Sequence, residues 1–224
     1  MTTPPPLDAL LTWVHDGQSL LDKAVAGMAS DAVASPSALP GWTRGHLLTH
    51  LSRNADALVN LLTWARTGIR TPMYATPEQR EADIEAGAGR PLADQVDDLR
   101  GSARRFAEAA TALPADRWSA VVTSAQGREI PASEVPWLRV REVWVHLVDL
   151  DLGYRMGVLP TELASTLVRD VCGWRSRKTG EPIEPVPDGV QFGQTLVRGT
   201  PDRLAGWLTG RELDGELPRL PRWL

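Results

Sequence analysis

The chain has 224 residues, of which 42% are hydrophobic and 23% charged, as is ordinary for a globular protein with a hydrophobic core in one large or two small domains. Its formal net charge of −4 argues against a basic surface for nucleic acid or anionic membranes. No stretch approaches the ~18 consecutive apolar residues of a membrane span. The first residues have no basic segment followed by an apolar run, so we expect no secretory signal and a cytoplasmic protein.

Helical periodicity predicts four long helices in the first part of the chain. The predicted ranges are 7–34, 44–68 with Thr43 as N-cap, 92–113 and 137–154. Between the second and third helices lies a long connection, 68–91, whose acidic middle is expected to form one helical turn. The segment 118–130 fits either a hairpin or a loop. Four helices with one long crossing connection are the outline of a four-helix bundle.

The remainder of the chain has a different pattern. A further helix is predicted over 160–177, a Pro-rich turn over 181–189, a strand over 190–197, and a short helix from Pro201 to Gly210. This mixture indicates a small α/β module. We therefore predict an α+β protein with two domains, a four-helix domain over 1–155 and a small α/β domain over 156–224.

The single cysteine, Cys172, excludes an intramolecular disulfide and fits a reducing compartment. The surrounding sequence "RDVCGWR" contains no histidine that would activate a thiol. We therefore expect a buried or inert thiol rather than a catalytic nucleophile.

The predicted fourth helix carries a polar stripe beside its apolar one, formed by Glu142, His146 and Asp149. Residues four apart lie on the same face of a helix, so Glu142 and His146 can point at one atom. Because the polar stripe borders the apolar stripe, we expect both side chains to be at least half buried. A buried carboxylate has to be paired or bound to a metal, since burying an isolated charge is very unfavourable.

His50 lies beside the core stripe of the second helix, with His46 one turn before it. If the second and fourth helices are neighbours, His50 can meet Glu142 and His146. Two imidazoles and one carboxylate are a common set of protein ligands at catalytic metal sites, and bundles build such sites from facing helices. Spacing alone leaves other interpretations open: a surface Glu–His pair, a structural histidine at position 50, and a helix-terminal role for His46.

Two longer stretches, "LPGWTRGHLLTHLSRNADAL" and "VPWLRVREVWVHLVDLDLG", together with "DRLAGWLTGR", resemble the mycothiol-dependent maleylpyruvate isomerase family. The resemblance covers essentially the whole chain. It implies a DinB-like four-helix N-terminal domain and a small α/β C-terminal domain. It also implies that His50, Glu142 and His146 bind a divalent metal, usually zinc. His50 matches the family ligand in the W-T-x6-H frame that starts at Trp42, so His46 is not expected to be one.

The resemblance implies an enzyme that converts maleylpyruvate into fumarylpyruvate, a step of aromatic (gentisate) catabolism, with mycothiol as co-substrate. A thiolate adds to the cis double bond, the resulting single bond rotates, and elimination gives the trans isomer. The expected partners are therefore mycothiol and a small-molecule substrate, not nucleic acid or a membrane. Within the same architecture, a mycothiol S-transferase acting on another electrophile and a non-enzymatic metal-binding or thiol-binding domain are the alternatives.

A dianionic substrate and the enolate formed on addition require cationic groups. The family resemblance points to a C-terminal arginine, for which Arg211 is the candidate. Asn54 and Asp149 lie near the expected ligands on their helices and are candidates for orienting a ligand by hydrogen bonding. The rivals of Arg211 are Arg198, Arg203, Arg219 and Arg222.

Overall fold

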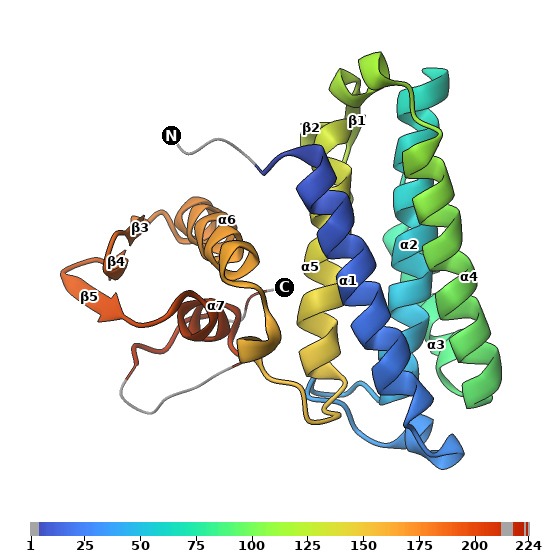
Figure 1. The fold of residues 1–224 in the computed structure, drawn as a ribbon, viewed down its shortest axis with the longest axis horizontal. Helices are drawn as coiled ribbons and strands as arrows, with labels where there is room; N and C mark the ends of the chain where they lie inside the picture. The colour runs from blue at the N-terminus through green and yellow to red at the C-terminus, as the bar shows by residue number, and fades with distance from the viewer. Residues whose placement is uncertain (1–4, 212–216, 222, 224) are drawn as a thin grey trace. The chain divides into compact units, whose positions relative to one another are not determined.

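The computed structural model describes residues 5–211, 217–221 and 223. The chain divides into two compact units, Met1–Leu152 and Gly153–Leu224 (Figure 1). Each unit contains its own helices and its own small antiparallel sheet. No described helix meets the length and hydropathy of a membrane span.

The first unit is a four-helix bundle with one additional helix (Figure 1). Helix α2 packs against α3, α4 and α5, and α1 packs mainly against α5. The predicted α+β class and the bundle are confirmed. The helices of this unit are α1 (Leu7–Ala26), α2 (Arg44–Thr67), α3 (Pro77–Ala88), α4 (Leu92–Thr111) and α5 (Val135–Asp149).

Helix α2 forms the centre of the unit because its leucines face the core on several sides, and six of them are at most 1% exposed. Burying one such side chain stabilises the fold by about 1.5–3 kcal/mol. Helix α1 reaches its close contact with α5 through Gly17, where a Cβ atom would lie 2.6 Å from the Cγ2 of Val143. The α2 leucines are Leu47, Leu48, Leu51, Leu58, Leu61 and Leu62.

Two of the predicted helices end earlier in the structure. The first ends at Ala26 with Gly27 as C-cap, and the residues predicted to continue it form a separate 3-10 helix, η1 (Ser30–Ala34). The fourth begins at Val135 and ends at Asp149 rather than at Tyr154. Asp151 and Gly153 adopt positive φ angles of 53° and 87°, which a right-handed helix cannot accommodate.

Helix α3 corrects the prediction of a connection with a single helical turn over 68–91. The helix has 12 residues, Thr76 caps it by accepting a hydrogen bond from the backbone N–H of Gln79, and Pro77 occupies its first turn. This is a typical helix start. Its apolar content is low, so periodicity alone did not indicate it.

Helix α3 lies close to α2 at two glycines, where no side chain separates the two helices. A Cβ atom on Gly45 of α2 would lie 2.1 Å from the backbone oxygen of Ala88, and one on Gly87 would lie 2.4 Å from the Cγ2 of Thr49. The buried Gln95 of α4 then donates to the carbonyl oxygen of Ala88 at 3.0 Å. These contacts fix α3 beside the N-terminal half of α2.

Between α4 and α5 the chain forms η2 (Ala115–Ser119), an antiparallel hairpin of β1 (Val121–Thr123) and β2 (Glu129–Pro131), and η3 (Ala132–Glu134). The segment that fitted either a hairpin or a loop is thus a hairpin.

The second unit places α6 (Thr161–Thr179) against β3 (Ile183–Val186) and α7 (Pro201–Thr209). Its sheet has the antiparallel order β3-β4-β5, with β4 (Gly189–Phe192) and β5 (Thr195–Arg198). The 3-10 helix η4 (Met156–Val158) precedes α6. The predicted short helix from Pro201 is confirmed.

Two predictions for this unit are wrong in detail. The strand predicted over 190–197 is two strands, because the chain turns at Gly193, whose φ is 55°, and Phe192 pairs with Thr195. The Pro-rich segment 181–189 contains strand β3 in addition to a turn. Cys172 of α6 is fully buried, and burial raises the pKa of its thiol to about 12, as expected for an inert cysteine.

Candidate metal centre

Helices α2 and α5 bring together the three side chains that the sequence singled out. The Nε2 of His50 lies 2.8 Å from the Oε2 of Glu142, and the Nε2 of His146 lies 3.2 Å from the same oxygen. One ligand atom from each residue lies within 4.8 Å of the other two. The three donor atoms therefore converge on one point, as the ligands of a single metal ion do.

The start of α2 is tied to the end of α5 by backbone acceptors. The Nε of Arg44 donates to the carbonyl oxygen of Leu150 at 2.8 Å, and its Nη2 donates to that of Asp151 at 3.0 Å. Leu150 and Asp151 are the residues directly after α5, where the helix leaves carbonyl groups without helical partners. This link keeps the two ligand-bearing helices in register.

The cluster is largely buried but not sealed. The side chains of His50, Glu142 and His146 are 7%, 20% and 14% exposed. Each ligand is thus desolvated enough to favour metal binding, while the exposed fraction leaves an approach for a molecule from solvent. Catalytic metal sites need such an approach, whereas purely structural sites are closed by protein ligands.

Charge within the cluster is distributed unevenly. Burial opposes ionisation of Glu142, but hydrogen bonds from His146 and His50 outweigh it and hold the pKa of the carboxyl well below its ordinary value. Burial likewise opposes protonation of His146, yet its bonds to Asp149 and Glu142 raise its pKa to about 9. Burial lowers the pKa of His50. Without a metal, the raised pKa of His146 thus favours its positively charged form beside the ionised Glu142, so the cluster stabilises a cation.

Asp149 and Asn54 were both candidates for orienting a ligand, and they lie in different places. The Oδ2 of Asp149 lies 2.8 Å from the Nδ1 of His146, which leaves Nε2 directed at Glu142. A carboxylate on the second ring nitrogen is the usual partner of a metal-binding histidine. Asn54 instead accepts a hydrogen bond from Arg139 at 3.2 Å and interacts with Tyr74.

His46 has a structural role at the start of α2. Its backbone N–H donates to the Oγ1 of Thr43, and its Nδ1 accepts from the backbone N–H of Thr43 at 3.2 Å, which completes a capping box. Its Nε2 lies 3.1 Å from the carboxylate of Glu85. Both ring nitrogens are therefore engaged away from the cluster. Trp42 packs its ring against the rings of both His46 and His50.

Arg80 is a neighbour of the cluster that the sequence analysis did not single out. Its Nη2 lies 3.2 Å from the Nδ1 of His50, and its guanidinium lies 5.7 Å from the centre of the Tyr74 ring. It was missed because it belongs to α3, whose range was predicted to be mostly a connection. The T-P-E-Q start of that helix was the signal that would have placed Arg80 in an ordered element.

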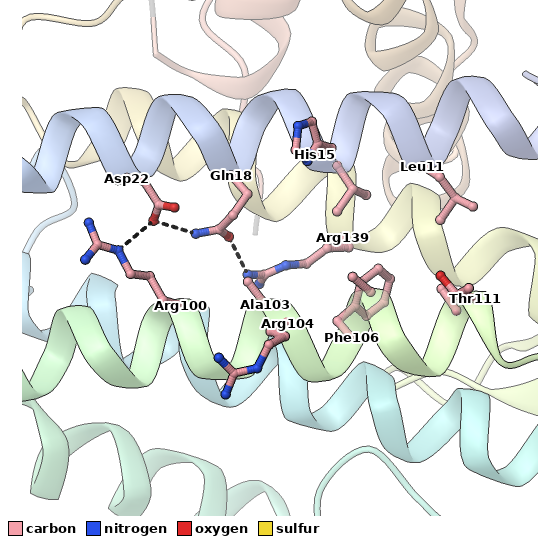
Figure 2. Close-up of a pocket in the computed structure, with 13 residues that line it drawn as sticks. Leu11, His15, Gln18, Asp22, Arg100, Ala103, Arg104, Phe106, Thr111 and Arg139 are labelled. Carbon is pink, nitrogen blue, oxygen red and sulfur yellow. Dashed lines mark hydrogen bonds and ion pairs between the residues drawn. The ribbon is translucent and has the colours of Figure 1, made fainter.

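A buried arginine, Arg139 of α5, lines a cavity of about 310 Å³ between α1 and α4 (Figure 2). Its Nη1 donates to the carbonyl oxygen of Leu51 and to Asn54, and its Nη2 donates to the Oε1 of Gln18. Figure 2 shows Gln18 continuing this network to Asp22 and Arg100. None of the three candidate ligands lines this cavity, so it is separate from the metal centre.

Arg211, the predicted catalytic arginine, lies in the second unit directly after α7. Its backbone N–H donates to the carbonyl oxygen of Gly206, its Nη1 donates to that of Thr209, and its guanidinium lies 5.5 Å from the centre of the Trp223 ring. Its catalytic role stays a prediction. Of its rivals, Arg198, Arg203 and Arg219 belong to the same unit, and Arg222 lies outside the described residues.

Comparison with known proteins shows to which family the chain belongs. Residues 4–151 match the family model described as the mycothiol maleylpyruvate isomerase N-terminal domain. Two solved structures match with a TM-score of 0.90 and 33% sequence identity over 100% of both chains: mycothiol-dependent maleylpyruvate isomerase and a histidine-to-alanine mutant of mycothiol-dependent maleylpyruvate isomerase. No curated protein sequence matches significantly. The chain belongs to the mycothiol-dependent maleylpyruvate isomerase family.

Proposed function

We propose that this protein is a mycothiol-dependent isomerase that converts maleylpyruvate into fumarylpyruvate. The observation that carries the proposal is the match over the full length of both chains, at 33% identity and a TM-score of 0.90, to the mycothiol-dependent maleylpyruvate isomerase. Because both units of the chain are matched, the similarity includes the C-terminal unit as well as the helical one. The single buried cysteine also fits a reaction in the reducing cytoplasm.

We infer that His50, Glu142 and His146 hold one divalent metal ion, with zinc preferred. The support is chemical: two imidazole nitrogens and one ionised carboxylate suit zinc, although other divalent ions accept the same set. When bound, such an ion lowers the pKa of a thiol, so that thiolate is available at neutral pH. The chain's own thiol is not suited to this task, because Cys172 is buried and holds its proton.

The proposed reaction needs no oxidant or reductant. The thiolate sulfur forms a bond to one carbon of the cis double bond, and the π electrons move onto the conjugated carbonyl as an enolate. The former double bond is now a single bond and rotates. The enolate electrons then re-form the double bond in the trans geometry, the carbon–sulfur bond breaks, and the thiolate leaves unchanged.

Residues around the cluster are assigned supporting roles in this chemistry. Asp149 fixes the orientation of the His146 ring through its Nδ1. Trp42 covers His50 with an aromatic edge, ring centres 5.5 Å apart, which limits access of water to this ligand. Arg80 supplies a positive charge beside the cluster, where a developing enolate or a substrate carboxylate would be stabilised. Arg211 is kept as a second cationic candidate.

The test is a spectrophotometric assay of maleylpyruvate on protein of known metal content, with and without mycothiol. Conversion to fumarylpyruvate that requires both thiol and metal is the expected result. If maleylpyruvate is untouched while mycothiol is consumed by another electrophile, the protein is an S-transferase instead. If metal binds tightly and neither reaction occurs, the protein is a metal-binding or thiol-binding domain.

A further inference from the structure

The first unit has a cavity of about 370 Å³ whose lining contains two arginines, and one of them, Arg80, also contacts the candidate ligand His50. It lies between the segment that leads into α3 and the turn of the β1–β2 hairpin, with Trp64 of α2 at its wall. Arg70 comes from the segment before α3 and Arg80 from α3 itself. Glu81 is the carboxylate in this lining, and its side chain is 63% exposed.

Arg80 connects this cavity to the candidate ligands. It lines the cavity, and its Nη2 also lies 3.2 Å from the Nδ1 of His50. Tyr74, another lining residue, lies under the same guanidinium. In a molecule that binds in the cavity and contacts Arg80, the bound group is therefore separated from His50 by the Arg80 side chain alone.

The contact between Arg80 and His50 depends on which ring nitrogen carries the proton. Arg80 can only donate, so Nδ1 has to offer a lone pair in this arrangement. A histidine that gives its Nε2 lone pair to a metal carries its proton on Nδ1, which then has nothing to offer a guanidinium. With metal on His50, the Nη2 of Arg80 is left to donate to another acceptor, and the adjoining cavity is where an acceptor can enter.

We propose that this cavity is the subsite for a carboxylate end of the dianionic substrate, anchored by Arg80 and Arg70. The proposal deepens the proposed function and rests on it, because it is the diacid substrate that requires cationic groups. A guanidinium matches a carboxylate with two parallel N–H donors. Arg70 is exposed and has no ion-pair partner among the residues that the structure describes, so its charge is available to the cavity. Arg80 also forms an ion pair with Glu81, whose side chain is largely exposed. A substrate carboxylate would take the place of the Glu81 carboxylate in this ion pair.

The direct test measures binding of a dicarboxylate that cannot react. Heptanedioate, a saturated straight-chain diacid, is titrated into the metal-loaded full-length protein by isothermal calorimetry, with heptanoate as the monoacid comparison. Arg80→Ala is expected to weaken heptanedioate binding by about tenfold or more, and Arg70→Ala by roughly three- to tenfold. Arg66→Ala is the matched control, since Arg66 is an exposed arginine in the last turn of α2 that does not line the cavity.

Steady-state kinetics give the second measurement. Both cavity variants are expected to raise KM for maleylpyruvate more than they lower kcat, and to leave KM for mycothiol unchanged. Arg80→Lys keeps the charge without the planar fork and is expected to fall between wild type and Arg80→Ala. Metal content of each variant is measured alongside, because Arg80 contacts a candidate ligand whereas Arg70 does not.

The proposal is overturned if Arg70→Ala and Arg80→Ala bind heptanedioate as well as Arg66→Ala does, or if they raise KM for mycothiol instead of maleylpyruvate. These results are distinct from failure of the proposed function. A wild-type protein that shows no isomerisation but binds heptanedioate in an Arg80-dependent manner retains the dicarboxylate site and loses the assigned reaction.

Discussion

A buried arginine of the second unit and the candidate metal centre of the first unit show how differently buried polar side chains are used in this chain. In the second unit Arg175 is 1% exposed, and its guanidinium donates to backbone carbonyl oxygens, at 2.9 and 2.7 Å to Leu208 and at 2.8 Å to Pro221. In the first unit, the ligand atoms of His50, Glu142 and His146 face one another. Their neighbours, Asp149 and Arg80, are charged side chains as well.

The difference separates a structural polar group from a binding site. Arg175 satisfies the carbonyl of Leu208 near the end of α7, where helices leave acceptors unpaired, and so connects α6 to α7. Among the described residues, the polar contacts of the candidate metal centre run from side chain to side chain. Titratable side chains that converge on one another in this way indicate a ligand-binding site, and here the two imidazoles and one carboxylate suit a metal cation.

The largest effect is expected from removing a ligand. His50→Ala should lower metal affinity by at least about a hundredfold and abolish metal-dependent isomerisation, because two protein ligands remain. His46→Ala is the matched control, one turn earlier on α2, and should retain metal. Metal content after dialysis checks both variants. Equal loss in the two would contradict the assignment of His50.

Arg175→Met should lower the stability of the fold without affecting metal binding, the opposite of the result expected for His50→Ala. Loss of the guanidinium leaves buried carbonyl groups unpaired, so the free energy of unfolding is expected to fall by about 2–4 kcal/mol. Metal content and the activity of the folded protein should not change. Thermal and denaturant unfolding check this, with Arg177→Met as a control because Arg177 is exposed on the same helix. If the Arg175 variant loses metal but keeps its stability, the assignment of a purely structural role to Arg175 is wrong.

An intermediate effect is expected from Asp149→Asn, which keeps the shape of the side chain but removes the charge that supports His146. Metal affinity should fall by about ten- to a hundredfold, with the three ligands still in place. Asp151→Asn serves as control, since asparagine also tolerates the positive φ of this position. Competition titration with a chelating dye gives both affinities. An Asp149 variant with wild-type affinity would show that this carboxylate does not orient the ring.

The smallest effect is expected at Cys172. Its pKa of about 12 keeps the thiol protonated at neutral pH, so Cys172→Ala should change the isomerisation rate by less than about twofold. In the native protein, an aromatic disulfide reagent should modify this thiol about a thousandfold more slowly than a free thiol of ordinary pKa. Rapid modification, or a large loss of activity in the variant, would return the cysteine to the list of candidate nucleophiles.

Local signals were enough to predict helix α2, because Thr43, the leucine repeat and Gly68 mark its start, face and end. The convergence of His50, Glu142 and His146 followed from helical spacing once the bundle and the family resemblance were added. Asp149 is three residues after His146 on α5, so its contact could be anticipated in the same way.

Periodicity did not predict helix α3 and Arg80, because contacts between distant segments fix this helix, and its cap sequence from Thr76 was the one local signal used too little. The helix is mostly exposed, and it is fixed by the absence of side chains at Gly45 and Gly87 and by Gln95 of α4. Periodicity does not report such contacts. The early end of α1 and the turn at Gly193 were missed for a related reason: one glycine ended each element while the surrounding pattern continued.

The most direct test of the account is titration of metal-free protein with zinc while maleylpyruvate isomerisation is followed at saturating mycothiol. The account predicts that activity rises in proportion to added metal, stops rising at one ion per chain, and is absent at every metal concentration when mycothiol is omitted. Full activity in the metal-free protein, or isomerisation without the thiol, would contradict it.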